Sequence, residues 1–152
     1  MKKDLLYIVA QFLLFALYFI DIPLGNRLNL PQWVGYGLLA LLISGGIIIV
    51  LGIVNMNDSL SPFPKPKTNG SLISHGIYYY VRHPIYIGIV ISMVAYGGYT
   101  QSLVKILISL ILLGVFYLKS DLEERYLLRK FEEYTQYKKK TGRFFPRFSS
   151  KV

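Results

Sequence analysis

Four nearly unbroken apolar stretches alternate with short polar segments along the chain. They are Leu5–Ile20, Trp33–Val54, Ile85–Tyr99 and Leu103–Leu118. A helix needs about 20 apolar residues to cross a hydrocarbon core of roughly 30 Å. The second stretch meets that length and the first comes close to it. The pattern predicts an all-α integral membrane protein with about four transmembrane helices.

The first stretch has an alternative interpretation as a signal peptide, because it follows Met1-Lys2-Lys3. A signal peptide would end at small residues suited to cleavage. The chain instead continues Asp21-Ile22-Pro23-Leu24. We therefore expect Leu5–Ile20 to be retained as a membrane span.

The last two stretches are separated only by Thr100-Gln101-Ser102, which follows Gly97-Gly98. This spacing predicts a tight helical hairpin. Each arm covers little more than about 20 Å at a helical rise of about 1.5 Å per residue. The lengths leave open whether the hairpin crosses the whole bilayer, but in either case it returns the chain to the side from which it came.

Positive charge is distributed unevenly between the two sides that this topology defines. With the N-terminus inside, fifteen of the seventeen Lys and Arg residues lie on the inner side, and only Arg27 and Lys105 lie outside. Lys and Arg concentrate on the cytoplasmic side of membrane proteins. The charges predict that both termini and the loop between the second and third stretches are cytoplasmic.

The two polar segments on the inner side differ in character. Residues 55–74 contain Pro62, Pro64 and Pro66, then Asn69-Gly70, which favour an ordered loop over a helix. From Asp121 to about Lys140, apolar residues recur at three-to-four spacing, which predicts one amphipathic cytoplasmic helix that ends before Gly142. A single domain is expected, with two spans (1–54), a loop (55–84), a hairpin (85–118) and a tail (119–152).

The composition excludes several classes of function. Hydrophobic residues make up 53% of the chain and charged residues 16%, against roughly 25% charged in soluble domains. The net charge of +9 lies at the ends of apolar runs and in the tail, which favours lipid headgroups over nucleic acid. The chain has no cysteine and two histidines, so disulfides, thiolate chemistry and a structural metal site are not expected.

One candidate site surrounds the start of the third apolar stretch. Pro84 suits the first turn of a helix, with Arg82 and His83 just before it. The amides at a helix start attract an anionic group, and Tyr78 and Tyr86 offer aromatic faces nearby. The alternative is that these residues only anchor the helix at the headgroups.

A second cluster, Lys119-Ser120-Asp121-Leu122-Glu123-Glu124-Arg125, follows the fourth stretch. Carboxylates beside a membrane need solvent or a matching cation. On a helix Glu123 and Glu124 point about 100° apart, so only one is expected to face a site shared with Arg82 and His83. The alternative is a solvated helix face. A third cluster, residues 143–147, has an alternative role as an interfacial anchor.

Two motifs in this order resemble the isoprenylcysteine carboxyl methyltransferase and phospholipid methyltransferase superfamily. The first is Gly76-x-Tyr78-x3-Arg82-His83-Pro84-x-Tyr86-x-Gly88. The second is Glu123-Glu124-x2-Leu127-x3-Phe131, then Tyr134-x2-Tyr137 and Arg143-x2-Pro146. The resemblance runs from about Leu60 to Pro146 and implies a small, prokaryotic-type member.

The resemblance implies a pocket for S-adenosylmethionine, which leaves as S-adenosylhomocysteine, and a lipophilic or prenylated acceptor from the membrane. Glu123, Glu124 and Arg82 are the implied catalytic residues. Lys119 stands where isoprenylcysteine enzymes have a substrate-contacting arginine, and keeps the charge without the bidentate fork. The implied cofactor-binding residues are Leu72, Ile73, Tyr78, Arg82, His83, Pro84, Ile85, Tyr86 and Glu123.

The chemistry of the cofactor agrees with these residues. The first turn of the third helix can hold its carboxylate, with Arg82 and His83, and Glu123 can pair with its ammonium. A carboxylate acceptor needs no general base, whereas an amine or thiol would need His83 or Glu124. The alternatives are an NADPH-dependent enzyme that resembles sterol reductases and a non-catalytic membrane scaffold.

Overall fold

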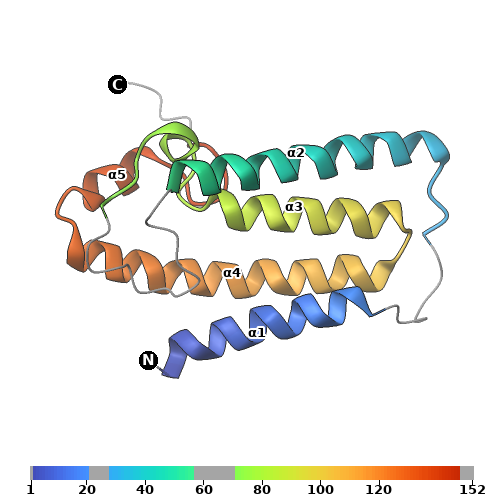
Figure 1. Cartoon of the computed structure of the whole chain (residues 1–152), viewed down its shortest axis with the longest axis horizontal. Helices are drawn as coiled ribbons and strands as arrows, with labels where there is room; N and C mark the ends of the chain where they lie inside the picture. The colour runs from blue at the N-terminus through green and yellow to red at the C-terminus, as the bar shows by residue number, and fades with distance from the viewer. Residues whose placement is uncertain (1, 21–27, 57–70, 148–152) are drawn as a thin grey trace.

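The computed structural model describes residues 2–20, 28–56 and 71–147, and the elements within these ranges are helical (Figure 1). No strand occurs in the described ranges, where the one β-type pairing is an isolated parallel bridge between Val81 and Gly142. The prediction of an all-α chain is confirmed for these residues. The elements are α1 (Lys2–Phe19), α2 (Gln32–Met56), the 3-10 helix η2 (Gly76–Tyr79), α3 (Pro84–Tyr99), α4 (Leu103–Lys130) and α5 (Tyr134–Lys140).

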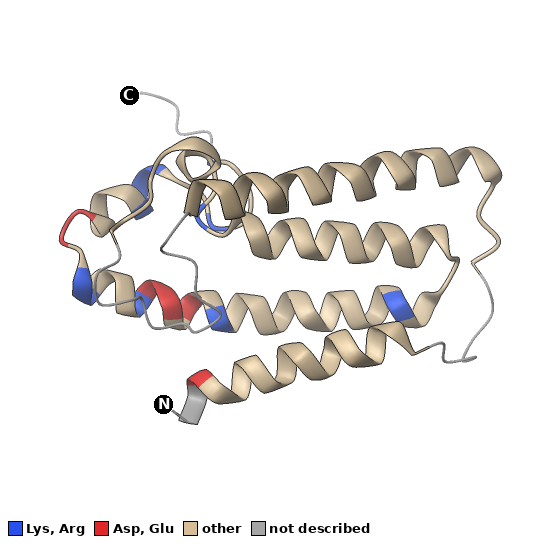
Figure 2. Ribbon diagram, in the orientation of Figure 1, with Lys and Arg blue, Asp and Glu red and all other residues tan. Residues whose placement is uncertain are grey.

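The four long helices lie side by side along the long axis of the molecule (Figure 1). Helix α3 packs between α2 and α4, and α1 packs on α4. The start of α1, the end of α2, the start of α3 and the end of α4 therefore share one end of the bundle, where α5 also lies. Figure 2 shows charged residues gathered at this end.

The predicted hairpin joins α3 to α4. Gln101 takes a positive φ of 56°, and the Ser102 side chain caps α4 by accepting a hydrogen bond from the Lys105 amide at 3.3 Å. Ser102 is thus a typical N-cap. The short polar segment turns the chain through one tight connection.

Glycine brings α2 and α3 into backbone contact. A Cβ atom built on Gly45 would lie 2.8 Å from the Gly88 carbonyl oxygen, and one on Gly88 would lie 2.9 Å from the Gly45 carbonyl oxygen. Small residues permit this close approach between helices in membranes. Gly52, about two helical turns beyond Gly45 and closer to the site, leaves room for the Ile85 side chain. The start of α3 is therefore held firmly against α2.

Among the described residues, two helices are long and apolar enough to cross a membrane. These are α2, with 25 residues, and α4, with 28 residues, whose apolar 18-residue windows have mean hydropathies of 2.7 and 2.0, while α1 and α3 are shorter apolar helices. Large apolar side chains point outward from α1, α2 and α4, as lipid-facing positions would. They include Leu6, Phe12, Leu13, Ile43, Ile47, Val50, Leu107, Leu110 and Ile111.

The predicted tail helix needs a correction. Helix α4 continues unbroken from Leu103 to Lys130, so the expected change from hairpin to tail after Leu118 lies inside one helix. The expected single helix from Asp121 to Lys140 is interrupted at Phe131, whose backbone is extended (φ −124°, ψ 117°). The break redirects the chain so that Tyr134 is buried at 1% exposure. Because the apolar spacing continues across it, periodicity could not reveal the break. Helix α5 ends just before Gly142, as expected.

The prolines and Asn69-Gly70 of the predicted loop lie outside the described residues.

Candidate active site

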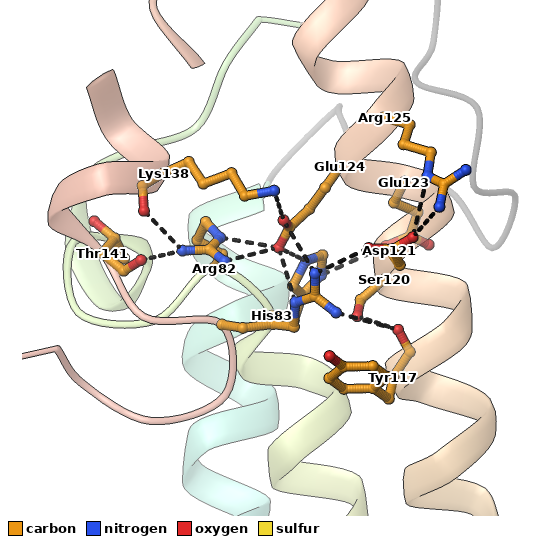
Figure 3. A network of polar contacts seen from close by, with 11 residues as sticks. Arg82, His83, Tyr117, Ser120, Asp121, Glu123, Glu124, Arg125, Lys138 and Thr141 are labelled. Carbon is orange, nitrogen blue, oxygen red and sulfur yellow. Dashed lines mark hydrogen bonds and ion pairs between the residues drawn. The ribbon is translucent and has the colours of Figure 1, made fainter. Parts of the chain in front are cut away.

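The Arg82-His83 turn and the tail lie against each other through backbone hydrogen bonds. The Arg82 amide donates to the Gly142 carbonyl oxygen at 2.9 Å, and the His83 amide donates to that of Arg143 at 3.1 Å. These bonds extend the bridge between Val81 and Gly142. The segment that precedes α3 and the segment that follows α5 therefore form one continuous wall beside α4 (Figure 3).

The Arg82 guanidinium occupies the centre of this junction. Its Nε and one terminal nitrogen each lie 3.0 Å from Oε1 of Glu124. The other terminal nitrogen donates to the carbonyl oxygens of Lys138, at 3.1 Å, and Thr141. The Arg82 side chain is 8% exposed and that of Glu124 is 1% exposed. A buried charge pair is tolerated when its remaining hydrogen-bonding groups are also satisfied, and Arg82 meets this condition.

Glu124 binds further cationic groups besides Arg82. Lys138 Nζ lies 2.8 Å from its Oε2, and Arg143 Nε lies 3.3 Å from its Oε1. His83 Nε2 also lies 3.3 Å from Oε1. Glu124 therefore joins α4 to the Arg82-His83 turn, to α5 and to the segment after α5.

Glu123 has different neighbours. Its Oε1 accepts a hydrogen bond from the Tyr86 hydroxyl at 2.5 Å, and its Oε2 lies 3.5 Å from His83 Nδ1. Only Glu124 therefore contacts both Arg82 and His83, as expected for one of the two glutamates, but Glu123 also reaches His83. The His83 ring lies between the two carboxylates and presents one nitrogen to each, although only Glu124 contacts Arg82.

Stacked aromatic rings lie beside Glu123. The rings of His83 and Tyr86 are parallel within 2°, with centroids 5.6 Å apart, and Tyr86 stacks on Phe116 at 4.4 Å. Lys119 Nζ lies 5.2 Å from the Tyr86 ring centroid and donates to Gln11 Oε1 at 2.8 Å. This lysine is 2% exposed, so its charge is held by an amide and an aromatic face rather than by water.

Tyr78 completes the described wall on the side of α2. Its hydroxyl donates to the Gly52 carbonyl oxygen at 3.2 Å, and its own carbonyl oxygen accepts from the Tyr137 hydroxyl at 2.6 Å. Burial and the nearby charge of Glu123 raise the pKa of Tyr78 well above its usual range. Tyr78 therefore remains a neutral hydroxyl.

The remaining predicted site residues lie at the margins of this cluster. Pro84 is buried in the first turn of α3, and the His83 side chain makes no capping hydrogen bond to that turn. Ile85 packs where a Gly52 side chain would otherwise stand. Leu72 and Ile73 are half-buried in the segment before η2. No cluster of three metal-ligating side chains occurs in the described ranges.

The sequence interpretation missed Gln11, Lys138 and Thr141. Gln11 carried a usable signal, because it is the one amide side chain in the apolar stretch Leu5–Ile20, and a polar group in hydrocarbon needs a partner. Lys138 and Thr141 carried none. Both contribute a backbone carbonyl to Arg82, a role that any residue type can fill, and the Lys138 ammonium also pairs with Glu124.

Part of the chain is similar to two curated proteins. The chain is 30% identical over 84 residues to the cobalt–zinc–cadmium resistance protein CzcN of Cupriavidus metallidurans, covering 55% of this chain and 39% of that protein. It is 35% identical over 101 residues to protein-S-isoprenylcysteine O-methyltransferase of Schizosaccharomyces pombe, covering 62% and 42%. The chain thus matches about two-fifths of the length of these curated relatives.

A family model also matches residues 32–134, which include Arg82, His83 and both glutamates. This range is more than half of the chain and spans α2, α3 and α4. The chain belongs to the phospholipid methyltransferase family.

Proposed function

We propose that this protein transfers a methyl group from S-adenosylmethionine to a lipophilic acceptor at the cytoplasmic face of a membrane. One observation carries the proposal beyond family membership. The two adjacent glutamates have separate environments, because Glu124 is surrounded by cations while Glu123 faces aromatic rings beside an uncapped helix start.

The side chains suit the groups of that cofactor. Glu123, 15% exposed, can accept an ammonium group. The rings of Tyr78 and Tyr86 offer faces for a cation. The free amides in the first turn of α3 can receive a carboxylate.

The bound cofactor supplies an activated methyl group on a sulfonium, and the protein contributes alignment and a dry site. Arg82 and Glu124 act as positioning residues in this proposal, because their charges fix the wall formed by the turn and the tail. Glu123 and His83 hold the polar end of the cofactor. The half-buried Leu72 and Ile73 provide an apolar strip by similarity to the family.

The acceptor class follows from the lack of a free base near the site among the residues that the structure describes. His83 presents one nitrogen to each glutamate, and cations surround Glu124. Removal of a proton from an amine or thiol would need a side chain free to take it. A carboxylate, which needs no base, is therefore the favoured acceptor, and the Lys119 ammonium supplies the matching charge.

The bundle also supports the proposed orientation. The charged end that carries α5 would face the cytoplasm, with α1 to α4 in the bilayer and the termini inside. The acceptor would then approach sideways through the apolar outer surface of α1 and α4. In this multi-pass arrangement the cofactor enters from water and the acceptor from lipid.

Calorimetry on the detergent-solubilised protein tests the proposal. S-adenosylhomocysteine should bind the native chain and should bind Glu123→Gln much more weakly. Glu132→Gln, the same change at an exposed position, should bind like the native chain. Binding of NADPH instead would support the reductase, and silence from both ligands would support the scaffold.

A second assay addresses the acceptor. Prenyl-cysteine carboxylates and phospholipid amines would be incubated with the protein and a radiolabelled methyl donor. We expect label in a carboxylate ester, which is released as methanol by mild base. Label retained on an amine would contradict the inference about the acceptor while leaving the methyltransferase proposal intact.

A further inference from the structure

Two adjacent phenylalanines after α5 point in opposite directions. Phe144 packs on the core cluster of Val90, Leu112 and Phe116, and its ring centroid lies 6.1 Å from that of His83. Phe145 is 71% exposed. The inward ring fixes the segment on the bundle, so the outward ring is held in place rather than left to swing freely.

The depth of Phe145 follows from the backbone pairing. The carbonyl oxygens of Gly142 and Arg143 accept from the amides of Arg82 and His83, immediately before α3 begins. The segment therefore runs at the level where the apolar residues of α3 start. In a bilayer this is the boundary between hydrocarbon and headgroups, the layer in which exposed aromatic side chains concentrate.

Positive charge flanks this ring. Lys139, Lys140 and Arg147 are exposed, and Arg147 donates to the Lys139 carbonyl oxygen at 3.3 Å. A tight turn at Gly142 keeps Phe145 close to the end of α5, since a Cβ on Gly142 would lie 3.0 Å from the Phe145 carbonyl carbon. Figure 2 shows the basic residues on α5. Lys138, by contrast, is paired with Glu124.

We propose that Phe145, Lys139, Lys140 and Arg147 form an anchor surface that docks on anionic phospholipid headgroups. The ring enters the boundary layer while the three cations meet the phosphates, a combination typical of interfacial anchors. Because the same segment pairs with Arg82 and His83, docking would hold the tail against the start of α3. The proposal is independent of the chemistry at Glu123.

The chain offers a matched control for charge. Arg129 and Lys130 are also exposed and end α4. They lie five and six residues beyond Glu124, which puts Lys130 about 9 Å further along the helix axis at about 1.5 Å per residue. Attraction to a charged membrane falls off within about 8 Å at physiological ionic strength. This distant pair should therefore respond weakly to the lipid.

Fluorescence in nanodiscs tests the anchor surface. Trp33 is the single tryptophan, so Trp33→Phe with Phe145→Trp leaves one indole at the proposed boundary. With phosphatidylglycerol present, its emission should shift to shorter wavelength, and lipids brominated near the headgroup should quench it more than lipids brominated at the chain end. Without phosphatidylglycerol, shift and quenching should both decrease.

The charge variants are made in this background. Lys139→Gln with Lys140→Gln should abolish the increase caused by phosphatidylglycerol, whereas Arg129→Gln with Lys130→Gln should preserve it. The proposal is overturned by emission that matches indole in water or by equal quenching with and without phosphatidylglycerol. It is also overturned if the two charge variants lose the phosphatidylglycerol-dependent increase to the same extent. Native mass spectrometry of the full chain gives a second measure, since the first variant should retain fewer phosphatidylglycerol molecules than the second.

Discussion

The Arg82 guanidinium and the Glu124 carboxylate meet at 3.0 Å although 41 residues and a helical hairpin separate them in sequence. Both side chains are buried, and the carbonyl oxygens of Lys138 and Thr141 accept further hydrogen bonds from the Arg82 guanidinium. The pair therefore fixes three segments at once, namely the turn before α3, the end of α4 and the tail. The pair therefore determines how these three segments are positioned around the site.

Glu124→Gln should lower stability more than any other single glutamate substitution in this region. The change leaves Arg82, Lys138 and Arg143 without their common anion, and loss of one partner of a buried pair costs about 3–5 kcal/mol. Thermal unfolding in detergent, followed by circular dichroism, measures the effect. Glu132→Gln is the control. Equal melting temperatures for Glu124→Gln and Glu132→Gln would show that the network does not stabilise the fold.

His83→Ala should weaken binding of S-adenosylhomocysteine and leave the protein folded. The variant loses the contacts to both glutamates and the stack on Tyr86, so Glu123 keeps the Tyr86 hydrogen bond but is held less firmly. We expect about a tenfold loss of affinity, or about 1.4 kcal/mol, by calorimetry. His75→Ala, an exposed histidine in the same segment, should bind normally. Unchanged binding by His83→Ala would place the cofactor elsewhere.

Lys119→Met should affect the acceptor and spare the cofactor. Methionine keeps much of the side-chain length but removes the charge, and a hydrogen bond to a charged group is worth about 1.5–3 kcal/mol. The KM for a prenyl-cysteine carboxylate should rise about tenfold or more, with unchanged affinity for S-adenosylhomocysteine. Gln11→Leu should cause a smaller rise, because Lys119 loses its partner but keeps its charge. An equal loss of affinity for S-adenosylhomocysteine would show that Lys119 contributes to cofactor binding.

Gly88→Ala should destabilise the packing of α2 on α3. The added methyl group would lie 2.8 Å from Ile49 Cγ1 and 2.9 Å from the Gly45 carbonyl oxygen, and overpacking of this kind costs about 1–3 kcal/mol. Gly46→Ala is the matched control, since no atom lies within 4 Å of a Cβ there. Melting temperatures in detergent should separate the two variants, and identical values would mean that α2 and α3 can move apart freely.

Local sequence patterns were sufficient for much of the fold. Apolar length located the four long helices, the short polar break located the hairpin, and proline located the first turn of α3. The meeting of the Arg82-His83 turn with the two glutamates also followed, because the hairpin returns the chain to its starting side. These features depend on periodicity and chain direction, which neighbouring residues encode.

Other features depend on contacts between distant backbone segments. The interruption at Phe131 lies within an uninterrupted amphipathic pattern, and the pairing of Arg82 with Gly142 uses main-chain groups that every residue possesses. The different environments of Glu123 and Glu124 could not be predicted from the sequence either. Their angle on the helix was known, but the position of the His83 ring between them arises only from the packing of α3 on α4.

The position of Lys138, Thr141 and Arg143 after Arg82 and Glu124 in the sequence has a consequence for biosynthesis. The ribosome delivers Arg82 and then Glu124 to the membrane before the residues that satisfy them have emerged. Until the tail has emerged, these two charges must rely on each other and on water at the bilayer surface. Insertion and completion of the site are therefore separate events, because the closing segment leaves the exit tunnel after both of these charges.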